Sequence, residues 1–235
     1  IELYVGPANK CILVEKHILT KSPFFALLFN QNPSRARYSQ SYQFPGFDTY
    51  TMATIVHWLH YGDIQSIAED YKADEIFHTA HMIKVYLLCC KLQLRSLMNL
   101  AVELLGHGYF KNKSAPTIEE IDTTYSKTDQ MSGLRIYMAA WARCREHAPL
   151  QKFMMAGPWD QIRFRALCKK HPDLLEHMKK LDASSDPESP ISLNPRFHEI
   201  CWYHDHPHGE QCGVSGKTFE TACSGTEPRL HEPIG

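Results

Sequence analysis

The fold of the first half of the chain is decided by residues 12–25, Ile-Leu-Val-Glu-Lys-His-Ile-Leu-Thr-Lys-Ser-Pro-Phe-Phe. The apolar residues at its start end a predicted strand over residues 11–14. Ser22-Pro23 then predicts the start of a helix, because Ser can cap a first turn and the missing N–H of Pro would be unpaired there in any case. The stretch therefore indicates a change from sheet to helix within a short span.

Two further segments complete a small predicted sheet. Residues 1–5 have the composition of a strand, and residues 6–10 supply Gly, Pro and Asn, which fit turn dihedral angles without strain. Residues 42–44 form a brief third strand that Pro45-Gly46 ends. We therefore expect an α+β fold in which three short strands accompany a set of helices.

The spacing of apolar residues predicts the helices that cover this sheet. Met52, Ile55, Val56 and Leu59 lie at i, i+3, i+4 and i+7, and Gly62 lets the chain leave the helix with a positive φ. Two later helices carry apolar residues too far around their circumference for a surface helix: Ile83, Tyr86, Leu87, Cys90, Leu97, Leu100, Ala101 and Leu104. We expect these two helices to form the buried core.

A second helical block is predicted over residues 116–182. Thr117 and Glu120 have the spacing of a capping box, in which each side chain accepts from the backbone N–H of the other residue. From residue 183 the chain becomes polar and turn-forming, and no helical or strand period persists beyond residues 197–203. We therefore expect residues 183–235 to be a His/Cys-containing tail without stable order.

Three segments in this order resemble the BTB/POZ domain, and in particular its fungal branch. They are residues 12–25, residues 55–64 with an aromatic-Gly corner at Tyr61-Gly62, and residues 83–92, which read Ile-Lys-Val-Tyr-Leu-Leu-Cys-Cys-Lys-Leu. The resemblance covers residues 1–110. It implies a BTB/POZ fold, in which a small sheet is capped by a helical cluster, with residues 116–182 as a C-terminal helical extension.

The resemblance implies a module that binds other proteins, a second copy of the chain among them. We expect partner contacts from Met52, Ile55, His57 and Tyr61. An alternative within the same family is a substrate adaptor for a cullin-based ubiquitin ligase, which docks through a hydrophobic-x-acid motif. Met52-Ala53-Thr54 occupies that place, and Thr54 replaces the acid, so the charge-assisted part of a cullin contact is missing.

Composition and charge argue against several other classes of protein. The chain has 235 residues, of which 43% are hydrophobic and 22% charged, as in an ordinary soluble protein. A net charge of -1 supplies no overall basic field for nucleic acid. The apolar runs at residues 85–90 and 136–142 are much shorter than the ~20 residues that span a bilayer. We therefore expect neither a nucleic-acid nor a membrane partner.

The cysteines and the start of the chain bear on the compartment. The eight cysteines have no regular spacing, which favours reduced thiols in the cytoplasm or nucleus over a disulfide framework. The chain begins at Ile1 without a charged-then-apolar leader, so we expect no signal peptide. A cytoplasmic or nuclear protein is the resulting expectation.

One cluster combines the residue types that ligate metals: Cys201, His204, His208 and Cys212. Cys201 and His204 can share a tetrahedral Zn²⁺, and His208 with Cys212 would complete a Cys₂His₂ set. The other interpretation is a His-rich tail that binds metal weakly. Because only three residues separate His204 from His208, we favour the weakly binding tail and expect no cofactor; zinc at these four residues, as part of a C-terminal zinc-binding module, is the alternative.

Other titratable residues predict no active site. His57 and His60 flank Trp58 on a helix, and no catalytic partner for them can be identified in the sequence. The capping box already accounts for Glu120, and neighbouring acids suit the positive end of a helix. Cys89 and Cys90 suit packing in a helical core. We therefore do not expect an enzyme.

Overall fold

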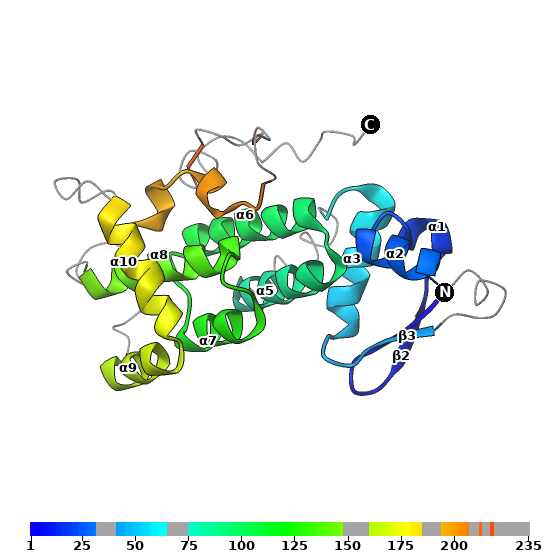
Figure 1. The fold of residues 1–235 in the computed structure, drawn as a ribbon, viewed down its shortest axis with the longest axis horizontal. Coiled ribbons are helices and arrows are strands. Elements are labelled where there is room, and N and C mark those ends of the chain that lie inside the picture. The colour runs from blue at the N-terminus through cyan, green and yellow to red at the C-terminus, as the bar shows by residue number, and fades with distance from the viewer. Residues whose placement is uncertain are drawn as a thin grey trace. The chain divides into compact units, whose positions relative to one another are not determined.

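The computed structural model describes residues 1–31, 41–64, 75–147, 160–184, 194–206, 212 and 217–218 (Figure 1). The chain divides into two compact units between Ala101 and Val102. The class is mixed α+β, as the sequence predicted. Among the described residues, no helix is both long and apolar enough to cross a membrane.

The first unit contains a three-stranded sheet with the order β2-β1-β3. Strand β1 (Glu2–Val5) pairs antiparallel with β2 (Lys10–Leu13) and parallel with β3 (Ser41–Phe44). Gly6 begins the β1–β2 turn at φ +75°, a conformation that glycine adopts without strain. All three strands lie within one residue of their predicted positions.

Four helices of the first unit contact one another: α1 (Lys16–Leu19), α2 (Pro23–Gln31), α3 (Thr49–Tyr61) and α5 (Glu75–Leu92). Phe25 of α2 packs against Tyr42 and Phe44 of β3. The carbonyl of Ser22 accepts the first hydrogen bond of α2, from the Ala26 N–H. The sequence predicted that the Ser22 hydroxyl caps this helix. The hydroxyl instead donates to the Leu92 carbonyl at 2.8 Å. Ser22 is fully buried, so this bond ties the start of α2 to the end of α5.

Local signals set both ends of α3. The Asp48 carboxylate accepts from the Thr51 N–H at 2.8 Å, and Gly62 ends the helix in the left-handed region at φ +78°. The helix turns Met52, Ile55 and Leu59 inward. The predicted core of α5 and α6 is also buried at most positions, while Cys90, Leu100 and Leu104 are half-buried.

Helix α6 (Arg95–Lys111) begins in the first unit and ends in the second. The other helices of the second unit are α7 (Ile118–Lys127), α8 (Gly133–His147), α9 (Gln161–Lys170) and α10 (Pro172–Ser184). The predicted capping box is confirmed at the start of α7, because Thr117 and Glu120 exchange bonds of 2.7 and 3.1 Å. Helix α8 is buried over most of its length and packs against α7 and α10.

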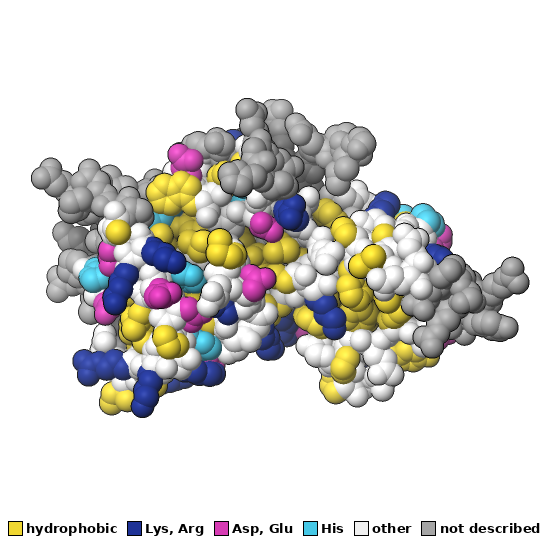
Figure 2. Space-filling model, viewed as in Figure 1, with side chains coloured by type: hydrophobic (Ala, Val, Ile, Leu, Met, Phe, Trp, Pro, Cys, Tyr) yellow, Lys and Arg dark blue, Asp and Glu magenta, His cyan; other side chains and the backbone are white. Residues whose placement is uncertain are grey.

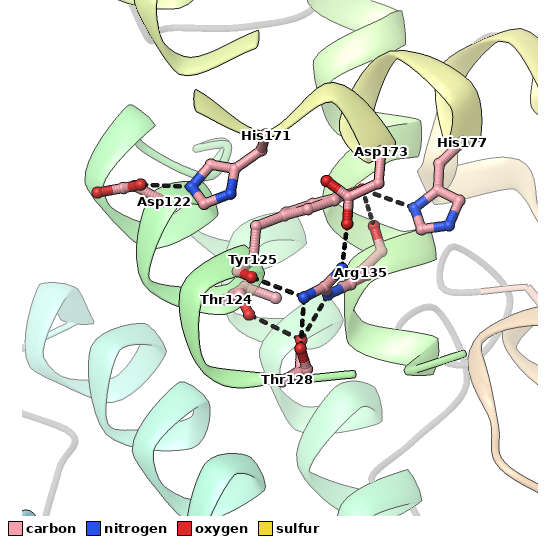
Figure 3. Close-up of polar contacts among 8 residues, drawn as sticks. All are labelled: Asp122, Thr124, Tyr125, Thr128, Arg135, His171, Asp173 and His177. Atoms are coloured by element: carbon pink, nitrogen blue, oxygen red, sulfur yellow. Dashed lines mark hydrogen bonds and ion pairs between the residues drawn. The ribbon is translucent and has the colours of Figure 1, made fainter. Parts of the chain in front are cut away.

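A buried arginine on α8 joins two neighbouring helices (Figure 3). The Arg135 guanidinium donates to the carbonyls of Tyr125 and Thr128 at the end of α7 and pairs with Asp173 in the first turn of α10. The Tyr125 hydroxyl lies 2.9 Å from Nδ1 of His177. These contacts fix the packing of α7, α8 and α10, because each backbone or charged group finds a partner inside the unit.

Within residues 183–235, which we expected to lack stable order, residues 194–206 have defined local structure. They form two short 3₁₀ helices, η3 (Pro195–Phe197) and η4 (Ile200–Tyr203). Tyr203 is buried and packs edge-on against Tyr137 of α8, with ring centroids 5.0 Å apart. These residues are ordered because they pack against another part of the chain. The composition of the segment does not indicate that packing.

Candidate functional site

Two of the four residues expected to contact a partner lie in the core. Met52 is 1% exposed and Ile55 is fully buried, on the side of α3 that packs within the first unit. Neither can reach a partner without unfolding, so their predicted role as contact residues is corrected to core packing. Helical spacing identified their shared face, but the same spacing describes a core face and a binding face equally well.

The segment expected to dock a cullin also faces inward. The Thr54 side chain is buried, its hydroxyl donates to the Tyr50 carbonyl at 3.1 Å, and it lies 3.0 Å from Nε2 of His81. Met52 is buried beside it in the sequence, and only Ala53 of the three is exposed. The fold therefore presents neither the hydrophobic residue nor the hydroxyl of this motif to a partner.

The other two expected contact residues lie at the end of α3. Tyr61 is 65% exposed and packs against the rings of His57 and His60, with centroids 4.6 and 4.2 Å apart. His57 is half-buried, and its Nε2 lies 3.4 Å from Oδ1 of Asp63. This group, which we call the α3 aromatic end, consists of His57, His60 and Tyr61 and presents one large aromatic ring to solvent.

The acidic residues of α7 and the buried thiol of Cys89 have structural roles. Glu120 completes the capping box, and Asp122 pairs with Lys170 and His171 at 2.7 and 2.6 Å. Burial raises the pKa of the Cys89 thiol well above its ordinary value, which suppresses its reactivity. These groups are accounted for by the packing of the helices.

Three side chains in the C-terminal segment form a group that could hold a metal ion: Cys201, His206 and Cys212. Their ligand atoms all lie within 4.8 Å of one another, and Cys201 Sγ is 3.5 Å from His206 Nε2. The set differs from the predicted one, because it contains His206, which was not predicted, and does not contain His204. His208 lies outside the described residues, so its predicted role as a ligand remains a prediction.

His204 lies beside this group and also contacts helix α6. Its Nδ1 lies 3.3 Å from Cys212 Sγ, and its Nε2 lies 3.3 Å from Oε1 of Glu103 on α6. The His204 side chain is only 3% exposed. Glu103 belongs to the same unit and could not be linked to the cluster from its position in the sequence, because about a hundred residues separate it from His204.

Burial also controls the ionisation of this cluster. It raises the pKa of the Cys201 thiol to about 11, and the adjacent Cys212 contributes further. It lowers the pKa of His204 to about 4, with His206 acting in the same direction, so the imidazole is neutral at physiological pH. Burial raises the pKa of Glu103 to about 7, against the opposing charge of Lys217. Neutral imidazole is the form that ligates metals.

Sulfur and imidazole nitrogen are the donors that Zn²⁺ most often takes in proteins. Tetrahedral coordination, with Zn–S of ~2.3 Å and Zn–N of ~2.0 Å, places sulfur and nitrogen ligands about 3.5 Å apart. The Cys201–His206 distance of 3.5 Å agrees with that separation. The cluster therefore has the donor set and the spacing of a site that could hold a metal ion.

The chain matches no protein-family model, no curated protein and no solved structure.

Proposed function

We propose that this chain is a non-catalytic protein-interaction module of the BTB/POZ type, related to the fungal branch of that family. The sheet supports the proposal: its three strands, in the order β2-β1-β3, occur at the expected residues, and helices α1, α2, α3 and α5 belong to the same unit. The corner at Tyr61-Gly62 supports it too, since Gly62 ends α3 in the expected left-handed conformation.

The surface proposed to contact a partner is the α3 aromatic end. Tyr61 is the large exposed ring of this group, and exposed aromatic residues contribute strongly to protein interfaces. The proposed partner is a protein, either a second copy of this chain or another chain. Acidic and basic side chains both occur on the face drawn in Figure 2, which suits a protein partner better than a phosphate backbone. Reduced cysteines fit a cytoplasmic or nuclear location.

The test is quantitative affinity purification of the full chain, combined with its mass in solution from light scattering. Tyr61→Ser should reduce the amount of partner protein retained, or the fraction of dimer, at least several-fold. The control is Met131→Ser, which removes an even more exposed apolar side chain (86% against 65% for Tyr61) from the second unit. A monomer that retains no stoichiometric protein, or equal retention by both variants, would contradict the proposal.

A second proposed function is zinc binding by the C-terminal segment, through Cys201, His206 and Cys212. The observation that favours it is the convergence of two thiols and an imidazole within 4.8 Å. Metal analysis of the reduced full chain should find one zinc per molecule, and the Cys201→Ser, Cys212→Ser double variant should contain none. No observation favours the cullin adaptor, because Met52 and Thr54 are buried.

A further inference from the structure

We propose that His204 is the fourth zinc ligand, through Nδ1, and that Glu103 orients it from α6, so that the metal fastens the C-terminal segment to the helices of the second unit. This inference rests on the zinc binding proposed above for Cys201, His206 and Cys212. It adds a ligand, a positioning residue and a structural role for the metal.

The coordination number of zinc is the first reason. Structural zinc sites are closed and tetrahedral, so three protein ligands leave one position to be filled. His204 Nδ1 lies 3.3 Å from Cys212 Sγ, close to the ~3.5 Å expected between a sulfur and a nitrogen on one zinc. Its ring centroid is 5.6 Å from that of His206, which already belongs to the group. His204 is not among the residues whose ligand atoms all lie within 4.8 Å of one another, so its ring must move toward Cys201 and His206 to complete the set.

The other nitrogen of the same ring supplies an independent observation. Nε2 of His204 is buried and forms no hydrogen bond with the described residues, yet Oε1 of Glu103 lies 3.3 Å away. A neutral imidazole carries one N–H, and a carboxylate beside Nε2 favours the proton there, which leaves the Nδ1 lone pair toward Cys212. Histidine ligands commonly donate their second N–H to a carboxylate in this way.

The scaffold brings the four ligands together before any metal is added. Glu199 pairs antiparallel with Thr218, and the Ile200 N–H donates to the Lys217 carbonyl at 2.9 Å. This pairing closes the loop that carries the four ligands. Between two of the ligands, Tyr203 is buried against Tyr137. The described residues around Cys201 and His204 are therefore held in place by contacts other than the metal, which lowers the ordering entropy that binding must overcome there.

Other contacts of the C-terminal segment with the helices show which parts of the second unit the metal would help to join. Arg196 lies over the rings of Phe110 and Trp141 and donates to the Tyr109 carbonyl at 3.4 Å. The Tyr203 backbone lies directly against Gly133 at the start of α8. The zinc cluster would add a third attachment, through Glu103 on α6. Metal binding would therefore be coupled to the packing of residues 194–206 against the helices of the second unit.

The experiment compares Zn²⁺ affinity and the visible spectrum of the Co²⁺ form in reduced, full-length protein. His204→Ala should weaken Zn²⁺ by on the order of 100-fold and alter the tetrahedral Co²⁺ bands, because water replaces a nitrogen. Glu103→Gln should weaken Zn²⁺ by about 10–100-fold and leave the tetrahedral bands in place. His17→Ala, at an exposed histidine of the first unit, is the matched control and should leave both unchanged.

The variants separate this inference from the zinc proposal on which it rests. If wild type binds one Zn²⁺, and His208→Ala rather than His204→Ala weakens it, zinc binding stands and His204 as the fourth ligand is overturned. If Glu103→Gln has the affinity of wild type, the positioning role is overturned. If reduced wild type binds no stoichiometric Zn²⁺, or the two thiols are found as a Cys201–Cys212 disulfide, both proposals fail. Circular dichroism of each variant checks that the helices remain folded.

Discussion

The carbonyl oxygen of Tyr125 accepts a 2.6 Å hydrogen bond from Nη2 of the buried Arg135 guanidinium (Figure 3). Tyr125 lies in the last turn of α7, where helix carbonyls lack partners within the helix. Arg135 also donates through Nε to the Thr128 hydroxyl at 2.9 Å. One side chain of α8 thus caps α7, and its charge is balanced by Asp173 of α10.

Arg135→Met should destabilise the second unit by about 3–5 kcal/mol, the usual loss when one member of a buried ion pair is removed. The variant leaves the Asp173 carboxylate without its partner and the end of α7 without its cap. Chemical denaturation measures the change. The control is Arg163→Met, whose pair with Glu119 is more than half exposed on both sides and should cost less than about 1 kcal/mol. Equal losses in the two variants would contradict the assigned role.

Met52→Ala tests whether α3 turns this residue into the core. Truncation of a fully buried methionine leaves a cavity, so we expect a loss of about 2–5 kcal/mol in the free energy of unfolding. Tyr61→Ser on the same helix removes an exposed ring and should change that free energy by less than about 1 kcal/mol. If the Met52→Ala protein is as stable as wild type and binds the partner more weakly, Met52 is a contact residue and not a core residue.

Interactions within a few residues of one another could be predicted from the sequence. The Thr117–Glu120 capping box and the Gly62 helix end depend on local backbone geometry, and both occur as expected. The spacing of Met52 and Ile55 identified a shared apolar face, but not whether another helix or another protein covers it. That distinction depends on tertiary packing, which a single helical pattern does not contain.

The metal cluster also depends on tertiary packing that local sequence patterns do not contain. The sequence identified Cys201 and Cys212 by residue type and gave His204 and His208 as their companions. The structure gathers His206 with the two cysteines and places His204 beside Cys212, and the sequence did not identify His206. Glu103 beside His204 is a long-range contact and had no local signal. Residue types were therefore predictable, while the members of the site depended on the folded chain.

Gly133→Ala tests the attachment of the C-terminal segment to α8. A Cβ at residue 133 would lie 2.0 Å from the Tyr203 carbonyl oxygen, far inside van der Waals contact, and the obstacle is backbone. We expect a loss of about 1–3 kcal/mol, as in other overpacked sites. Hydrogen exchange of residues 194–206 should accelerate more than that of α7. Gly46→Ala meets no atom within 4 Å and is the control; similar exchange in both variants would exclude a close contact at Gly133.

Asp122→Asn tests the contacts between α7 and the end of α9. Hydrogen bonds from Lys170 and then His171 lower the pKa of Asp122 below its ordinary value of 3.8. The folded state therefore favours the ionised carboxylate, and its contribution to stability is fully present above pH 3.8. That contribution is lost as the pH falls below 3.8, through the lower pKa of the folded state.

The stability of wild type should exceed that of Asp122→Asn at neutral pH, and the difference should shrink as the pH falls below 3.8. Because Asp122 is more than a third exposed, the difference at neutral pH should be at most about 1 kcal/mol and should decrease with added salt. Urea denaturation across this pH range measures both proteins, with Asp129→Asn as an exposed acidic control in the same unit. A difference that stays constant with pH would mean that Asp122 contributes through its shape and hydrogen bonds alone, and that its charge has no part in joining the two helices.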